Sequence, residues 1–406
     1  MHNKYLTISF YILWIINTLL IIQEWFLRAL RYQQELTSWG FSEFLINYQG
    51  GVVRRGLFGE LLYMFCLHFS YSPKFIVIPI CYLSFITFLC IIYYITKKLQ
   101  LSYLAIPTLY CLFGGDLIRK DYLILVLIFF SILLFQKIKT SGLRLPITAS
   151  VLFLALNLHE ATFFIAAPLF FLVVFSDSDT RISLKEKIAY SLFLISVMAL
   201  LCLAKGDKST AEAIFFSWQQ LYPDNFVQFN TGNSIGSLSW ETGGTFKTHA
   251  FRNFIVGYIP YIGLLLRPLS IFIIFYLMVQ VTLRQYRHKR QTLVNKYIYI
   301  TTFQFFALLP MFTVLSCDFR RVCFYWVSAS LFSLYIMKDK KVTWMDTSFV
   351  QNIIDLANKI FKIKIYKPIP FILLLSFSVP YYNNPPSEYC SPIIKKTAQM
   401  LKATIL

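Results

Sequence analysis

Charged residues are scarce in this chain of 406 residues, in which 14% are Asp, Glu, Lys or Arg and 57% are hydrophobic. A soluble globular domain carries about 25% charged residues, so the composition argues against a soluble fold. Paired cysteines are also lacking, because the eight cysteines form neither CxxC nor a Cys/His spacing that binds zinc. This absence argues against a zinc site, and we name no metal ligand and no cofactor from the sequence.

Acidic residues are few as well, 19 against 38 Lys and Arg, which gives a net charge of +19. A charge of this size is found in proteins that bind nucleic acid. The basic residues, however, lie in short segments between hydrophobic runs, as the positive-inside rule predicts for a membrane protein. We expect no nucleic-acid partner.

Long hydrophobic runs fill most of the chain. Each approaches the roughly 20 residues that a helix needs to cross a bilayer, where only a helix satisfies its own backbone. The predicted spans are 5–23, 75–95, 101–114, 121–136, 145–158, 160–176, 188–204, 254–283, 297–315, 322–336 and 368–382. They predict an all-α, polytopic integral membrane protein with about 11 transmembrane helices in a single domain, residues 1–406.

The segment 55–70 is hydrophobic but short, and we expect it to be an interfacial or re-entrant helix. If it were a span, Lys97, Lys98 and most later basic clusters would lie outside, against the positive-inside rule. We therefore expect the N-terminus in the cytoplasm and the C-terminus in the periplasm. The expected location of the protein is the inner membrane of a bacterial cell. The short helix then lies in the first periplasmic loop, and residues 205–253 form one large periplasmic loop.

Arginines next to glycines mark the predicted first periplasmic loop, NYQGGVVRRGLFGELL. The guanidinium groups of Arg54 and Arg55 match phosphate oxygens in geometry, which favours a diphosphate site. Anchoring to lipid headgroups is the alternative interpretation. Arg320 and Arg321 repeat this chemistry in the last loop beside Asp318, a candidate catalytic carboxylate.

Two further outer loops carry ionisable side chains. Asp116 and Arg119, in GGDLIRKD, are either a polar turn with weak ion pairs or contacts to a sugar or to a metal-bound phosphate. His159 and Glu160 lie inside a long apolar stretch, where ionisable groups are costly and are candidates for function. We expect one of them to act as a base, with Glu160 preferred. The alternative is a hydrogen-bonded pair that closes a helical hairpin.

Aromatic side chains alternate with amides and hydroxyls in the large loop. Trp218 and Trp240 are the candidates for stacking on sugar rings, while amides would bind the hydroxyls. An aromatic belt at the membrane interface is the alternative.

The chain resembles the O-antigen and capsule repeat-unit polymerases of bacteria. The resemblance rests on its spans, its large periplasmic loop, its periplasmic arginines and its many Ile, Phe, Tyr and Lys residues. It implies transfer of a growing glycan from undecaprenyl diphosphate to the next lipid-linked repeat unit, with Arg54, Arg55, Arg320 and Arg321 as the arginines of that family. The implied partners are an undecaprenyl-diphosphate-linked oligosaccharide, membrane lipids and a chain-length regulator.

Other classes of membrane protein share some of these features. The first loop also resembles that of the GT-C class of glycosyltransferases, which place an essential acidic residue there, and Glu43 and Glu60 are available. A flippase for the same lipid would be basic and polytopic too, but would more often show two similar halves. A membrane acyltransferase would use His159 as its base.

Overall fold

The computed structural model describes residues 36–99, 117–174, 183–250, 291–316 and 318–338, with a few isolated positions elsewhere. These residues form helices and contain no β-strand, so the prediction of an all-α fold is confirmed for them. The predicted spans 5–23, 101–114, 254–283 and 368–382 lie outside the described residues, as does Asp116.

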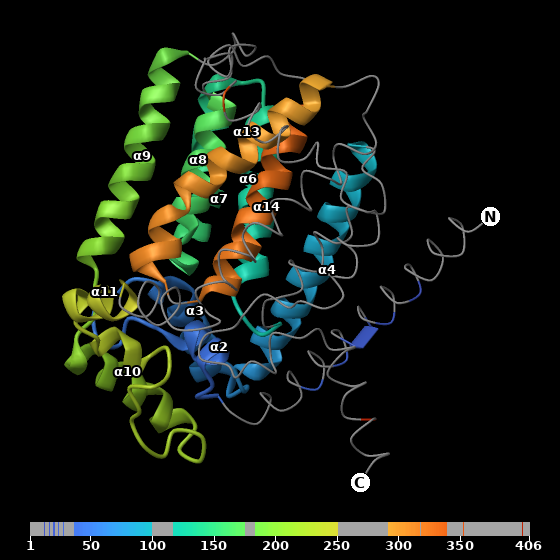
Figure 1. Cartoon of the computed structure of the whole chain (residues 1–406). Coiled ribbons are helices and arrows are strands. Elements are labelled where there is room, and N and C mark those ends of the chain that lie inside the picture. Colours follow the sequence, from blue (N-terminus) through green and yellow to red (C-terminus); the bar gives the residue numbers. More distant parts are fainter. Residues whose placement is uncertain are drawn as a thin grey trace.

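Long helices lie side by side in a bundle (Figure 1). They are α4 (Lys74–Lys98), α6 (Asp121–Lys137), α7 (Ser141–Leu158), α8 (Thr162–Val174), α9 (Leu184–Leu203), α13 (Gln291–Ala307) and α14 (Phe319–Met337). Helices α4, α6, α8 and α14 run in one direction, while α7, α9 and α13 run back. We call the end of the bundle at which α6, α8 and α14 begin the site end.

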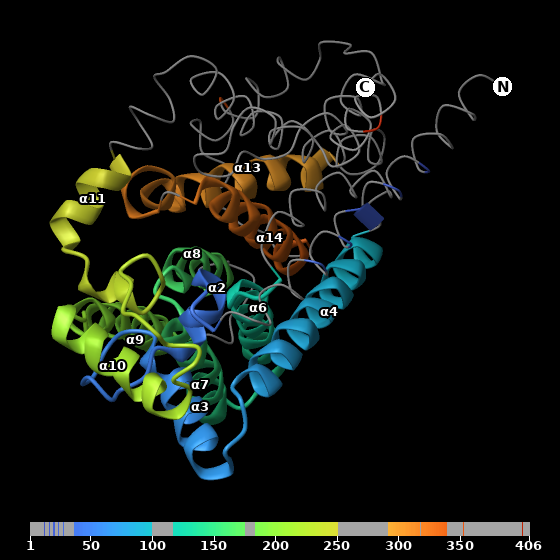
Figure 2. The ribbon, with the colours of Figure 1, turned by 90° about the horizontal axis from the view of Figure 1, so that it is seen from below.

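Short elements cover the site end of the bundle (Figure 1). They are α2 (Trp39–Ser42), a 3-10 turn at Glu43–Leu45, α3 (Gly56–Phe69), α10 (Lys208–Leu221), a second 3-10 turn at Gly236–Ser239, and α11 (Thr242–Ala250). Figure 2 looks at this end and places α2 over the ends of α6 and α8. Much of the expected large loop 205–253 is therefore helical, and α3 agrees with the short helix expected at 55–70.

Within the described residues, most hydrophobic runs predicted as spans form helices whose ends agree to within a few residues, because long hydrophobic runs are strong signals of helix. The predicted span 297–315 is wrong in its continuity. Helix α13 ends at Ala307, and a π-helical turn at Met311–Leu315 follows Pro310. Proline has no N–H to donate and disturbs the preceding helical turn, so one regular helix does not pass through this position.

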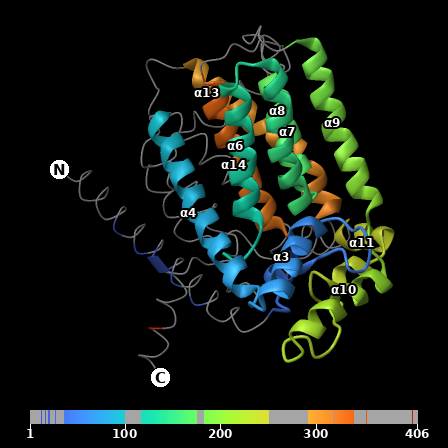
Figure 3. The same ribbon diagram turned by 180° about the vertical axis from the view of Figure 1, so that it is seen from behind.

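Two of the described helices, α4 and α9, are long and apolar enough to cross a membrane. Helix α9 lies at the edge of the bundle beside α7 (Figure 3). Its side chains Leu192, Ile195 and Leu200 are 58%, 59% and 63% exposed. A core helix of a soluble protein would bury such side chains, so this apolar face is suited to contact with lipid.

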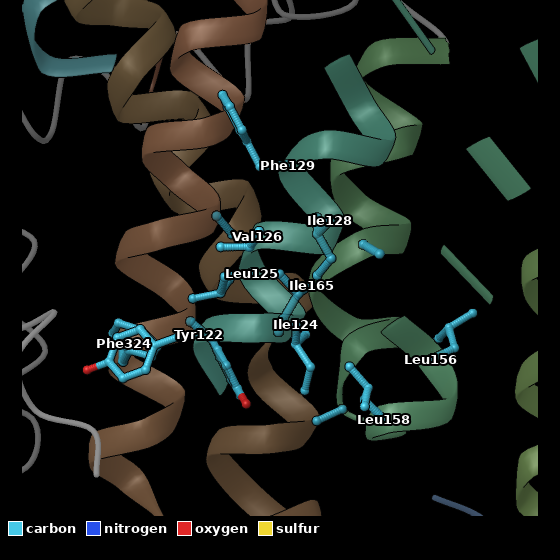
Figure 4. Close-up of a cluster of buried hydrophobic side chains, with 14 of the residues drawn as sticks. Tyr122, Ile124, Leu125, Val126, Ile128, Phe129, Leu156, Leu158, Ile165 and Phe324 are labelled. Atoms are coloured by element: carbon cyan, nitrogen blue, oxygen red, sulfur yellow. The ribbon is translucent and has the colours of Figure 1, made fainter. Parts of the chain in front are cut away.

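The core lies between α6, α7, α8 and α14 (Figure 4). Ile124 and Ile128 of α6, Leu156 of α7, Ile165 of α8 and Phe324 of α14 are completely buried. Burial of one such side chain contributes about 1.5–3 kcal/mol. This packing fixes where α6, α8 and α14 begin, and so positions the loops of the site end.

Close backbone contact fixes α3 against the first loop. A Cβ atom on Gly59 would lie 1.9 Å from the carbonyl oxygen of Ile46, so only glycine permits this approach. The N–H of Tyr48 donates to Glu60 Oε2 at 2.8 Å, and Trp218 Nε1 donates to the carbonyl of Leu45 at 2.7 Å. The loop is therefore held by α3 on one side and by α10 on the other.

Gly59→Ala should destabilise the folded protein by about 1–3 kcal/mol, the usual cost of overpacking, because α3 would have to move away from Ile46. Gly142→Ala in α7 is the matched control, since its Cβ would meet nothing within 4 Å. Thermal unfolding of both variants in detergent measures the effect. Equal melting temperatures for the two variants would contradict this account of the α3 contact.

Candidate functional site

Charged side chains meet at the site end, where helices of the bundle begin or end. We call them the charged cluster: Glu43, Arg54, Arg55, Arg119, Lys120, Asp121, Glu160, Asp318 and Arg321. They come from the first loop, the turn before α6, the turn between α7 and α8, and the start of α14. The described helices bring together residues that are up to about 280 positions apart in the sequence.

Arg55 and Glu160 form the most complete ion pair of the cluster. Arg55 Nε donates to Glu160 Oε2 at 2.6 Å, and its Nη2 donates to Oε1. Arg54 Nη1 lies 3.4 Å from the same Oε1. Arg55 has a positive φ of 67° as the N-cap of α3, an uncommon backbone conformation for a residue with a side chain. The surrounding structure thus holds this arginine in a fixed direction.

Arg321 and Arg119 form the other pairs of the cluster. Arg321 Nε donates to Asp121 Oδ1 at 2.7 Å, and the hydroxyl of Tyr325, one helical turn further on, donates to the same oxygen. Arg119 Nη1 donates to Asp318 Oδ2 at 2.9 Å. Asp318 also caps α14 by accepting the N–H of Arg321. These contacts join the beginnings of α6 and α14.

Glu43 lies between the two arginines and is 1% exposed. Its Oε1 is 3.7 Å from Arg119 Nη2 and 3.7 Å from Arg321 Nη1. Burial alone would raise the pKa of this carboxyl, but the two guanidiniums together hold it below its ordinary value. Glu43 is therefore an anion at neutral pH, and removing both arginines would leave it a buried charge without a partner among these contacts, a change that typically costs about 3–5 kcal/mol.

Lys120 is fully buried, and its Nζ has no hydrogen-bond partner among the described residues. The ring of Phe44 lies 5.5 Å from Nζ. Burial lowers the pKa of Lys120 from 10.5 to about 7, although Glu43 acts in the opposite direction. A buried amine of this kind exchanges its proton near neutral pH.

The structure restricts what His159 and Glu160 can do. His159 Nδ1 accepts the N–H of Ala161 at 3.0 Å, so this nitrogen carries no proton. Its 3.6 Å separation from Glu160 Oε2 is accordingly not an ion pair. Burial and the nearby Arg55 lower the pKa of His159 well below its ordinary value. In this arrangement the acceptor nitrogen of His159 is already occupied and Nε2 carries the proton, which argues against the predicted role of His159 as a base.

Glu160 is accessible at its edge, with 20% of its side chain exposed. Burial would raise its pKa, yet the paired Arg55 holds the pKa well below its ordinary value. A carboxylate held in this way is a weak base for as long as the pair persists.

The two tryptophans of the large loop differ in their exposure. Trp218 is fully buried, where it packs edge-on against Tyr63 and donates to the backbone of the first loop. The prediction that Trp218 stacks on a sugar is therefore wrong, since neither ring face is accessible. Trp240 is 42% exposed and lies beside Trp39, with 5.7 Å between ring centroids.

Several residues of the cluster received no role from the sequence. Lys120 and Asp121 were visible only as part of a charged turn, and Tyr325 had no local signal except its spacing of four residues from Arg321, which places both on one helix face. Arg320 begins α14, but its side chain lies outside the described residues.

The pH dependence of the protein's stability should reveal the titration of the buried Lys120 amine. Between pH 7 and 10.5 the unfolded chain binds a proton at Lys120 that the folded chain releases, so this residue makes stability rise with pH. Lys120→Met should remove this contribution. The melting temperature of the native protein should therefore rise relative to that of Lys120→Met between pH 7 and pH 10.

Lys208→Met is the control for that experiment, because the Lys208 side chain is 75% exposed. Its melting temperature should follow that of the native protein at every pH. Parallel curves for the native protein and Lys120→Met would show that the buried amine does not titrate in this range.

Comparison with known proteins assigns no function to the site. No family model matches the chain, and no curated protein or solved structure was found to be similar to it. Within the described residues, no group of His, Cys, Asp and Glu side chains is arranged to hold a metal ion. The chemistry of the charged cluster is therefore the basis for any functional conclusion.

Proposed function

We propose that this protein is a polytopic glycosyltransferase of the bacterial inner membrane that polymerises lipid-linked oligosaccharide repeat units. The observation that carries the proposal is the charged cluster, in which several arginines converge at one end of an apolar helical bundle. Buried arginines at the membrane face suit the diphosphate of an undecaprenyl-diphosphate-linked glycan.

The distribution of charge between the two ends supports the proposed orientation. The end opposite the site carries exposed lysines that are simple anchors, among them Lys97, Lys98, Lys139 and Lys185. The site end instead carries several arginines that are paired with carboxylates, whereas the described residues of the opposite end contain one such pair, Arg144 with Glu186. Basic anchors mark the cytoplasmic side of a membrane protein, so the charged cluster faces the periplasm, where lipid-linked repeat units are joined.

The proposed reaction is a direct transfer of the glycan. An acceptor hydroxyl oxygen attacks the anomeric carbon of the donor glycan, a new C–O bond forms, and the bond to the diphosphate oxygen breaks. The hydroxyl proton passes to a carboxylate, and undecaprenyl diphosphate leaves with its charge stabilised by Arg54, Arg55 and Arg321. Glu160 and Asp318 are the candidates for that carboxylate, with 20% and 17% of their side chains exposed, whereas those of Glu43 and Asp121 are each 1% exposed.

The exposed pair Trp39 and Trp240 supports a sugar contact at the same end. Aromatic faces bind the apolar faces of sugar rings, and the pair joins the first loop to the large loop. Membrane lipids surround the bundle in this proposal, and a chain-length regulator is a proposed partner.

Glu43 favours a second candidate function, a GT-C-type transfer of one sugar from a polyprenyl-linked donor. That class resembles this chain in having a short helix and an acidic residue in the first outer loop. Here the short helix is α3, and the acidic residue is Glu43, buried between Arg119 and Arg321.

Gel analysis of surface polysaccharide tests the function. Deletion of the gene should leave one repeat unit on the lipid A core, whereas loss of a flippase removes even that unit and loss of a GT-C transferase shortens the unit. Arg55→Lys and Arg321→Lys should reduce polymer at least tenfold, because lysine keeps the charge but loses the two-pronged contact. Lys208→Ala, at an exposed site, is the control at equal membrane level.

Reporter fusions test the orientation. A fusion after Asn233 should be periplasmic, and a fusion after Lys139, between α6 and α7, should be cytoplasmic, because the two positions lie at opposite ends of the bundle. A cytoplasmic result at Asn233 would place the charged cluster on the wrong side for this reaction and would reject the proposed function.

A further inference from the structure

Arginines and carboxylates are equal in number among the described side chains of the charged cluster. Four arginines with described side chains (Arg54, Arg55, Arg119 and Arg321) pair with four carboxylates (Glu43, Asp121, Glu160 and Asp318). Opposite charges in equal number compensate one another in a buried cluster without any ligand. An incoming anion can therefore bind these arginines strongly only if it replaces one of the carboxylates.

Glu160 is the carboxylate in the best position to be replaced. It is held by side chains alone, and its oxygens occupy the two positions in the Arg55 fork that phosphate oxygens also fit. The side chain of Glu160 is 20% exposed and that of the neighbouring Arg54 is 34% exposed, whereas that of Arg55 is 14% exposed, so solvent reaches the pair at Glu160 and Arg54. Asp121, by contrast, is 1% exposed and is held by both Arg321 and Tyr325.

Lys120 supplies an independent observation. Once each described arginine of the cluster has been paired with a carboxylate, Lys120 is the basic residue left over. Its Nζ lacks a hydrogen-bond partner among the described residues. Its electrostatic interactions with Glu160 and Arg55 place it in the same group of charges. A fully buried amine without a partner is costly, and an anion that entered the cluster would remove this cost.

We propose that Glu160 is a displaceable internal anion: a diphosphate enters the fork of Arg54 and Arg55, Glu160 leaves it, and the added negative charge compensates Lys120. This inference rests on the proposed function, because it names the diphosphate of the lipid-linked donor as the replacing group. Once released, Glu160 is no longer held by Arg55 and becomes a stronger base. The base is thus activated only when the donor is bound, which prevents proton transfer without a donor.

Binding measurements with the full-length protein in lipid nanodiscs test this inference. The probes are undecaprenyl diphosphate and inorganic pyrophosphate. Glu160→Gln should bind the lipid diphosphate about 10- to 100-fold more tightly than the native protein, the range expected when one competing charge-assisted contact is removed. The same variant should lose polymer formation. A group with a purely structural role would not increase affinity when it is removed.

Matched variants separate this effect from a general change in charge. Glu212→Gln removes one carboxylate from α10 at the same end, where Glu212 pairs with Lys208, and should leave affinity unchanged. Lys120→Met should weaken binding, and Arg55→Lys should weaken it in both the native and the Glu160→Gln backgrounds. Melting temperatures confirm that each variant is folded.

The outcomes distinguish the inference from the function. Tighter binding of both probes by Glu160→Gln supports displacement by the diphosphate itself, and tighter binding of the lipid probe alone supports displacement that also needs the lipid tail. Equal or weaker binding of the lipid probe overturns the inference, even if deletion of the gene leaves a single repeat unit and the polymerase function stands. Tighter binding in Glu160→Gln together with normal polysaccharide in the deletion strain would reject the function and keep the diphosphate site.

Discussion

The ion pair between Arg55 and Glu160 joins the first loop to the turn between α7 and α8, and the other guanidiniums and carboxylates of the charged cluster are compensated in the same way. A guanidinium or carboxylate taken out of water is stable only with an opposite charge close by. At the site end this requirement is met by Arg321 with Asp121 and by Arg119 with Asp318, while Glu43 lies between the two arginines. The loops that carry these residues are consequently held together by charge as well as by packing.

In the proposed function, a cluster that is compensated without ligand would be stable at rest and would still be able to bind a diphosphate. The carboxylates occupy the arginines in the resting protein, and a phosphate group offers the same geometry with more negative charge. Helix packing in the core, around Ile128 and Ile165, keeps the cluster in place while a surface carboxylate is exchanged.

Aromatic residues show where reasoning from the sequence failed. Trp218 and Trp240 have similar surroundings in the sequence, and both suggested contacts with sugar. Trp218 instead fills the space between α3 and α10 and donates to Leu45, because an indole N–H in the interior requires an acceptor. The exposure of Trp218 depends on how α10 packs against α3, and no local sequence pattern predicts that packing.

The sequence by itself determined the helices and the separation of charge, since hydrophobic runs and basic segments are local features that act over one or two helical turns. It identified Arg55 and Glu160 as candidates, but as a ligand contact and a base that act separately. Only the tertiary structure decided that these two residues pair. It also decided that Arg321 and Tyr325 donate to the same oxygen of Asp121. Lys120 is buried there without a hydrogen-bond partner among the described residues. The reason is physical: these contacts join positions separated by 105 and 200 residues, and they form only after helix packing has brought the chain together.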